Sequence, residues 1–268
     1  MIVRDHFRAM GTEIEVLAAP AAAGALPAVR REFERLEALL SRFRPESELS
    51  RLNRDGQIEA GHDLAAVVTL ALEARERTGG LFDPTVHDAV VAAGYDRTFD
   101  DLPADGPAGA TSRCGGAVEI VGRRIRLAPG VRIDLGGIGK GYAADRARDL
   151  LAGHGACLVN AGGDLAATGS WPVGVDGGPT LELTDAALAT SGRDRRRWQR
   201  GGEERHHLID PRTGRPAAVE LVRATVVAPT AVEAEVLATA AFLGAELGDV
   251  PRVLVHADGS IVLAGSLA

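Results

Sequence analysis

Residues 132 to 145 read Arg132-Ile133-Asp134-Leu135-Gly136-Gly137-Ile138-Gly139-Lys140-Gly141-Tyr142-Ala143-Ala144-Asp145. Apolar residues alternate from Val131 to Leu135, which predicts a short strand, and the helical spacing after the glycines predicts a helix to about Ala152. Glycines at the turn allow close backbone approach, a helix N-terminus favours anionic oxygen, and Lys140 adds a positive charge in the first turn. The alternative interpretation is a tight turn that merely requires glycine, with Lys140 in solvent.

Composition and motifs exclude several functional classes. The net charge of −7 argues against a nucleic-acid partner. The two cysteines, Cys114 and Cys157, lack the paired spacing of a zinc or redox site. A P-loop is excluded because Gly141 stands where Ser or Thr must follow Lys140. With no apolar signal region at the start and no apolar run of about 18 residues, we expect a soluble, cytoplasmic chain without a membrane span.

Strand and helix patterns are mixed along the chain, which predicts the α+β class rather than repeated βαβ units. No internal repeat or linker divides the chain, so we expect a single domain over residues 1–268. We expect helices at 28–40, 63–78 and 230–243, with a short one after Ser47 or Ser50. We expect strands at 12–17, 118–121, 124–127, 156–160, 165–168, 171–175, 181–183, 186–190, 252–257 and 260–264.

Polar groups next to glycine recur at the ends of the expected strands. They are Asn160-Ala161-Gly162-Gly163-Asp164 and Thr190-Ser191-Gly192, which local turns explain as well as a ligand does. His207 precedes an Asp-Pro turn and can act as a base near neutral pH, although an ordinary solvated histidine is the alternative. Glu235 and Thr239 share one helix face and can offer oxygen to a cation of the magnesium type, or can simply be solvated.

Taken in order, these motifs resemble the ApbE family of FAD:protein FMN transferases. The matching blocks run from residue 10 to about residue 244: Met10-Gly11-Thr12, Ser41 to Asn53, Gly80-Leu81-Phe82-Asp83-Pro84-Thr85, Ile133 to Ala143, Asn160 to Asp164, Ala189-Thr190-Ser191-Gly192 and His207 to Gly214. The resemblance implies a single T-fold-like α+β domain. It also implies a magnesium-dependent reaction in which FMN passes from FAD to a threonine hydroxyl of an acceptor flavoprotein, through a phosphodiester, with AMP as leaving group.

The resemblance also implies roles for individual residues. His207 would deprotonate the acceptor threonine. Magnesium would be held by the carbonyl of Gly137 and the side chains of Glu235 and Thr239. The residues that would contact FAD are Met10, Phe43, Leu81, Phe82, Asp83, Asp134, Lys140 and Ile209, with Lys140 near the diphosphate.

Two positions depart from the family pattern. Glu235 stands where the family usually has Asp, and its extra methylene matters because magnesium requires tight octahedral geometry at about 2.0–2.1 Å. Phe43 replaces Tyr or Trp, which keeps ring stacking but loses a hydrogen bond. Two other activities therefore remain open: a non-catalytic FAD-binding protein with a weakened metal site, and an FAD pyrophosphatase that passes FMN to water. A purely structural or interaction role is the third alternative.

Overall fold

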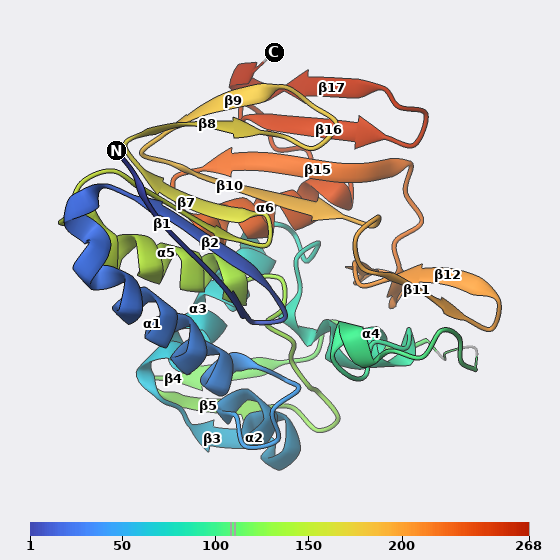
Figure 1. The fold of residues 1–268 in the computed structure, drawn as a ribbon. Coiled ribbons are helices and arrows are strands. Elements are labelled where there is room, and N and C mark those ends of the chain that lie inside the picture. Colours follow the sequence, from blue (N-terminus) through green and yellow to red (C-terminus); the bar gives the residue numbers. More distant parts are fainter. Residues whose placement is uncertain (108, 110, 268) are drawn as a thin grey trace.

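The computed structural model describes residues 1–107, 109 and 111–267. Its centre is an eight-stranded sheet in which every neighbouring pair is antiparallel (Figure 1). In spatial order its strands are β1 (Val3–Ala9), β2 (Thr12–Ala18), β6 (Cys157–Ala161), β7 (Asp164–Thr168), β10 (Ala187–Gly192), β15 (Leu221–Ala228), β16 (Arg252–His256) and β17 (Ile261–Ala264).

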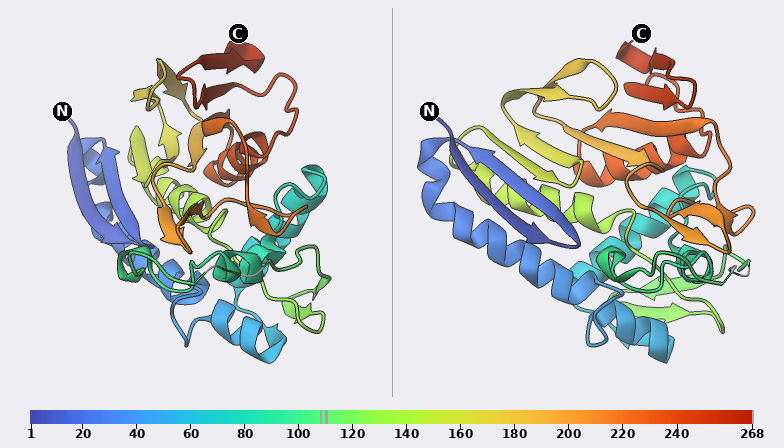
Figure 2. Two further views of the ribbon diagram at one scale, coloured as in Figure 1. Left: turned by 90° about the vertical axis from the view of Figure 1, so that its right-hand side faces the viewer. Right: turned by 45° about the vertical axis from the view of Figure 1, so that its right-hand side comes forward.

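Helices cover one face of this sheet. These are α1 (Leu26–Leu40), α5 (Gly139–Ala152) and α6 (Ala231–Phe242), which the rotated views place on the same side (Figure 2). The main core forms there, because alternate strand residues such as Val159, Ala166 and Ala189 point toward apolar side chains of the helices. The sequence of α6 is almost entirely apolar, as expected for a helix buried in a core.

A hairpin covers part of the opposite face. It consists of β8 (Ser170–Gly174) and β9 (Thr180–Thr184). The other half of the strand alternation, including Leu158, Leu165 and Leu188, forms a second core there together with Trp171. Most of the central strands are therefore buried on both faces. A strand with one exposed face would instead alternate between apolar and polar residues.

Smaller elements surround the sheet. A three-stranded sheet has the order β3 (Gln57–Glu59), β5 (Arg124–Leu127), β4 (Val118–Val121). Two-stranded ribbons are formed by β11 (Arg197–Arg200) with β12 (Glu203–His206), and by β13 (Ile209–Asp210) with β14 (Arg215–Pro216). The remaining helices are α2 (Glu48–Asp55), α3 (His62–Arg77), α4 (His87–Ala92) and the 3₁₀ turns at Pro20–Ala25, Pro84–Val86, Phe99–Asp101 and Gly265–Leu267.

The α+β prediction is confirmed, and so are the helix after the glycine turn and the two capped helices. Ser47 caps α2 by accepting the Ser50 N–H at 3.0 Å, and Thr230 caps α6 by accepting the Glu233 N–H at 3.2 Å. Among the described residues no helix has both the length and the apolar composition needed to cross a bilayer.

The strand expected from Val131 to Leu135 is wrong. The segment is extended, and Ile133 and Leu135 are buried as the alternation predicts. Its backbone, however, bonds to the Asn53 side chain in both directions at 2.8 Å and to the Pro84 carbonyl at 2.8 Å, so no ladder forms. Side-chain and loop partners satisfy the polar groups that a neighbouring strand would otherwise satisfy.

Candidate functional site

Two turns and the end of one strand meet at one end of the central sheet. Ile14 pairs with Ala161 and Asp164 with Ala189, so the β1–β2 turn, the β6–β7 turn and the end of β10 share that end. The β6–β7 turn requires glycine at position 162, where φ is +68° and a Cβ would lie 2.2 Å from the Thr12 hydroxyl oxygen. The β6–β7 turn is therefore packed closely against Thr12.

Another glycine brings α5 against α6. A Cβ at Gly141 would lie 2.6 Å from the Ala231 carbonyl oxygen, so only glycine permits this approach. The Gly141 N–H donates to Glu235 Oε2 at 2.8 Å, which makes a side chain of α6 the partner of an unpaired N–H in the first turn of α5. The glycine-rich stretch thus places Lys140 beside Glu235.

Lys140 lies between two buried carboxylates. Its Nζ donates to Glu235 Oε1 at 2.6 Å and also to Asp164 Oδ2. The side chains of Asp164 and Glu235 are only 4% and 5% exposed. Burial alone would lower the pKa of Lys140, but the charges of Asp164 and Glu235 more than compensate, so its pKa is raised. The interpretation of Lys140 as a solvated residue is therefore wrong, and so is that of Glu235.

The cluster carries more negative charge than one ammonium neutralises. Burial, followed by the charge of Asp164, raises the pKa of Glu235 to about 7, although Lys140 and the Gly141 N–H favour its charged form. Two carboxylates that share one cation are a site at which an additional cation would be favourable.

Removing Lys140 should destabilise the fold. In Lys140→Met, two buried carboxylates would lose their cation, and breaking such a group typically costs about 3–5 kcal/mol. The free energy of unfolding, measured by urea denaturation, should fall by this order. Lys140→Met/Glu235→Gln should recover part of the loss, because it removes one of the stranded charges. Equal stability of the wild type and Lys140→Met would contradict the described ion pairs.

His207 follows β12 and lies near Lys140 and Arg196. The residue is half-buried, and its Nδ1 atom is inaccessible and has no hydrogen-bond partner among the described residues. Burial and the charges of Arg196, His206 and Lys140 lower the pKa of His207 to about 3. The imidazole is therefore neutral near pH 7 and able to accept a proton.

This low pKa predicts a signature in acid stability. Between pH 6.5 and about 3 the unfolded chain binds a proton at His207 that the folded chain does not, so stability falls as the pH falls. Relative to His207→Asn, the wild type should lose about 1.4 kcal/mol per pH unit below pH 6.5. Urea titrations of both proteins from pH 7 to pH 4 measure the difference. A difference that does not vary with pH would contradict the burial of this imidazole.

Two of the expected metal ligands, Glu235 and Thr239, lie four residues apart on α6. On α6, the Thr239 hydroxyl is 3.0 Å from the Ser191 hydroxyl at the end of β10. Gly137 lies just before α5, where a Cβ would be 3.2 Å from the Phe82 ring. Among the described residues no group of three or more His, Cys, Asp or Glu side chains is arranged to hold a metal. The carboxylate, hydroxyl and carbonyl oxygens are nevertheless of the hard type that magnesium prefers, and the excess negative charge fits a cation.

An aromatic group lies close to the glycine-rich stretch. Phe43 packs on Tyr95 with ring centroids 5.5 Å apart, and the Arg42 guanidinium lies 4.0 Å from the centroid of Phe43. Arg42 Nε is 2.7 Å from Asp134 Oδ2, while Asp134 Oδ1 accepts the Gly136 N–H at 2.6 Å. Asp134 thus connects the aromatic group to the turn before α5.

The other expected FAD contacts come from different elements. The Asp134 N–H donates to the Pro84 carbonyl, which brings the segment Leu81 to Asp83 beside the glycine turn. Asp83 is buried and caps a 3₁₀ turn by accepting the N–H and hydroxyl of Thr85. The Met10 methyl would lie 3.7 Å from a Cβ at Gly139. Ile209 is buried in the aromatic group that contains Tyr95.

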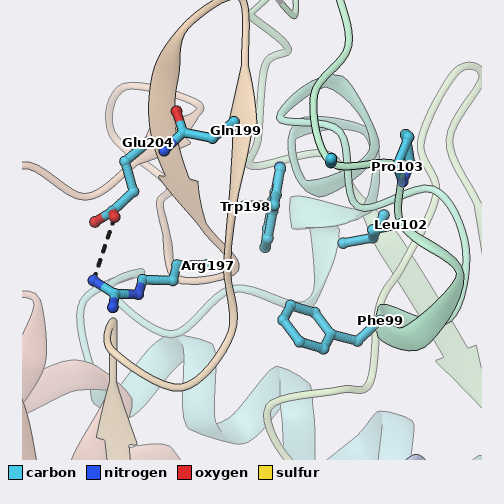
Figure 3. Close-up of a pocket in the computed structure, with 8 residues that line it drawn as sticks. Phe99, Leu102, Pro103, Arg197, Trp198, Gln199 and Glu204 are labelled. Carbon is cyan, nitrogen blue, oxygen red and sulfur yellow. Dashed lines mark hydrogen bonds and ion pairs between the residues drawn. The ribbon is translucent and has the colours of Figure 1, made fainter.

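A groove of about 550 Å³ lies on the outer side of this aromatic group (Figure 3). Phe99 and Leu102 of the loop after α4 face Trp198 of β11, and Arg197 pairs with Glu204 at its rim. The Trp198 indole N–H donates to the Ala93 carbonyl at 2.8 Å. This hydrogen bond anchors the β11–β12 hairpin. Arg196 lies directly before the hairpin in sequence and His207 directly after it.

The sequence patterns do not identify every residue of the site. In sequence, Asp164 is only a carboxylate next to glycine, and Ser191 is only a hydroxyl at a strand end. Arg42 and Arg196 give no clear signal, because neither a lone arginine after a helix nor a basic run has a distinctive spacing. The run from Arg195 to Arg197, next to the Thr-Ser-Gly motif, was the available signal.

Comparison with known proteins identifies the family. The model of the ApbE family matches residues 10–264. The chain belongs to the ApbE family. It is 31% identical over 257 residues to a Treponema pallidum protein named FAD:protein FMN transferase, covering 82% of this chain and 71% of that protein. A Salmonella typhimurium protein of the same name is 30% identical over 226 residues, covering 74% of this chain but only 64% of that protein.

Solved structures agree as well. The ApbE protein of Thermotoga maritima superposes with a TM-score of 0.86 at 25% identity, covering 99% of this chain and 98% of that one. A flavin transferase ApbE from Vibrio cholerae gives 0.81 at 23% identity, covering 100% and 98%, and supports the fold. Membership of the ApbE family confirms the expectation drawn from the order of the motifs.

Proposed function

We propose that this ApbE-family chain transfers FMN from FAD to a threonine hydroxyl of an acceptor flavoprotein and releases AMP. The observation that carries the proposal is the placement of Lys140 and His207 at one end of the sheet, with Glu235 beside them. Attack on a diphosphate requires neutralisation of its charge and a base for the attacking hydroxyl. The lysine supplies positive charge, the carboxylate can bind a cation, and the neutral imidazole can accept the proton. The names of the aligned relatives support the same substrate pair.

In the proposed reaction the threonine oxygen attacks the FMN phosphorus. A new P–O bond forms, the bond from that phosphorus to the bridging oxygen breaks, and AMP leaves with the bridging oxygen. His207 accepts the hydroxyl proton. Lys140 stabilises negative charge on the diphosphate, and the aromatic side chain of Phe43 provides a surface on which the flavin stacks.

The pKa of His207 fits this role once FAD is present. A base with a pKa near 3 is weak, and catalysis by proton transfer is most effective when the pKa is near the working pH. The cations Arg196 and Lys140 are among the causes of the low value, so a bound diphosphate would offset them and raise the pKa. The imidazole would therefore become a stronger base when substrate is in place.

Glu235, Thr239 and the carbonyl of Gly137 are the groups that we propose for magnesium. When bound, the ion would neutralise charge on the diphosphate and on the departing AMP oxygen. In the absence of other cations Lys140 already neutralises part of the charge of Asp164 and Glu235, and the Thr239 hydroxyl is held by Ser191. Magnesium binding can be tested without substrate. Addition of Mg²⁺ should raise the melting temperature of the wild type, and this rise should disappear in Glu235→Ala.

The alternatives are separated by their products. The purified chain is incubated with FAD, Mg²⁺ and a flavoprotein known to carry threonine-bound FMN, expressed without its flavin. A transferase releases AMP only with the acceptor and leaves flavin covalently on it. A pyrophosphatase releases FMN and AMP without the acceptor, and a carrier releases neither. Either of the last two results would overturn the proposed function.

A further inference from the structure

Four arginines lie between the end of β10 and the start of β11: Arg193, Arg195 and Arg196 in the loop, and Arg197 as the first residue of β11. Their partners differ. Arg195 pairs with Asp176, and Arg197 pairs with Glu204 at 3.4 Å. Arg193 donates to the Leu221 carbonyl at 3.0 Å. Arg196 has no carboxylate partner among the described residues, and its Nη2 reaches only the Gly11 carbonyl, at 3.5 Å. Its guanidinium therefore retains most of its hydrogen-bonding capacity.

The position of Arg196 is at the candidate site. The Gly11 carbonyl belongs to the β1–β2 turn, next to Met10, which reaches Gly139. Arg196 directly precedes β11, and His207 directly follows β12, so the base of this hairpin carries both residues. Arg196 is near enough to lower the pKa of His207, after burial, and to oppose the raised pKa of Lys140.

Arg196 adds a positive charge with which no described carboxylate pairs. The residue is half-buried, whereas the nearby ammonium of Lys140 is already held by Asp164 and Glu235. A phosphate group would supply the missing negative charge, and a guanidinium can donate two parallel hydrogen bonds to phosphate oxygens. Neither Arg195 nor Arg197 can do this without losing its own carboxylate.

From these contacts we infer that Arg196 binds the diphosphate of the dinucleotide substrate. The inference rests on the proposed function, because it deepens the assignment of FAD as substrate. Arg196 is the specificity-determining cation by which the site would distinguish a flavin dinucleotide from an uncharged flavin.

The test is binding rather than turnover. The affinity for FAD and for riboflavin, which has no phosphate, is measured by flavin fluorescence for the wild type and Arg196→Gln. Loss of a charge-assisted pair should weaken FAD binding about 10- to 100-fold and leave riboflavin binding unchanged. Arg195→Gln and Arg197→Gln are matched controls, which remove the same charge from the two adjacent positions, and their FAD affinity should stay within about 3-fold of that of the wild type.

A second variant guards against misfolding. Arg196→Lys keeps the charge but loses the planar fork, so its FAD affinity should fall between those of the wild type and Arg196→Gln. If the wild type binds FAD and Arg196→Gln binds it equally well, the inference fails and the proposed function stands. If Arg196→Gln changes only the KM for the acceptor, Arg196 serves the acceptor and the inference is wrong. Absence of FAD binding by the wild type would overturn both.

Discussion

His207→Asn is expected to lower the rate of FMN transfer by about 10²- to 10⁴-fold, the usual contribution of a positioned general base. Asn keeps much of the shape and polarity of the imidazole but cannot accept a proton at neutral pH. Because the cations that bind the diphosphate remain, the affinity for FAD should change by no more than a few-fold. Single-turnover measurement of acceptor labelling, alongside FAD titration, separates the two quantities.

The matched control for this variant is the neighbouring histidine. His206 is buried and its Nε2 is 3.0 Å from the Ala217 carbonyl, so this ring nitrogen has a structural partner. The Nδ1 atoms of His206 and His207 both lack a hydrogen-bond partner among the described residues. His206→Asn should affect stability more than the transfer rate. A transfer rate in His207→Asn within about 3-fold of the wild type would contradict the role of His207 as the base.

Glu235→Ala is expected to remove the metal-dependent part of the turnover, a loss of about 10³-fold or more if the ion supplies several kcal/mol of charge stabilisation. The variant should remain folded, since Lys140 keeps Asp164 as its partner and the crowding of two carboxylates is relieved. FAD affinity should be largely retained. Rates with and without Mg²⁺, and calorimetric Mg²⁺ titration, measure these effects.

Glu235→Asp tests the departure from the family pattern. A carboxylate one methylene shorter should support metal-dependent turnover at least as well as the wild type, because the resemblance to the ApbE family implies aspartate at this position. Glu233→Ala is a surface control on the same helix, where a half-exposed carboxylate pairs with Arg77 at 3.2 Å. Unchanged turnover in Glu235→Ala would remove position 235 from the metal site.

The order of local motifs is sufficient to predict the family and the fold class. Glycines with special conformations, capping residues and helical periodicity are local signals, and α5, α6 and the cap at Ser47 follow them directly. The strand expected at Val131 to Leu135 does not form. Alternation of apolar residues predicts which side chains are buried, but a strand also needs a neighbouring strand to which its backbone can hydrogen-bond. Here the Asn53 side chain, 80 residues away in sequence, occupies that position.

The partners within the site were beyond local reasoning. Lys140 contacts Asp164 and Glu235 only because β7, α5 and α6 lie close together. The close packing of α5 on α6 requires glycine at position 141, because a Cβ there would collide with the Ala231 carbonyl. For the same reason the sequence predicted a solvated carboxylate or a metal ligand at position 235, but not a carboxylate that hydrogen-bonds a lysine and a helix N–H. Folding brings Lys140, Asp164 and Glu235, which are far apart in sequence, into one buried group of ion pairs.

The most direct test of the central claim is the ratio of AMP released to flavin bound covalently on the acceptor, measured in one reaction of the wild-type chain with FAD and Mg²⁺. Transfer predicts one AMP for each bound flavin, and neither product when the acceptor threonine is replaced by valine. AMP that accumulates together with free FMN, independently of that threonine, would contradict the account.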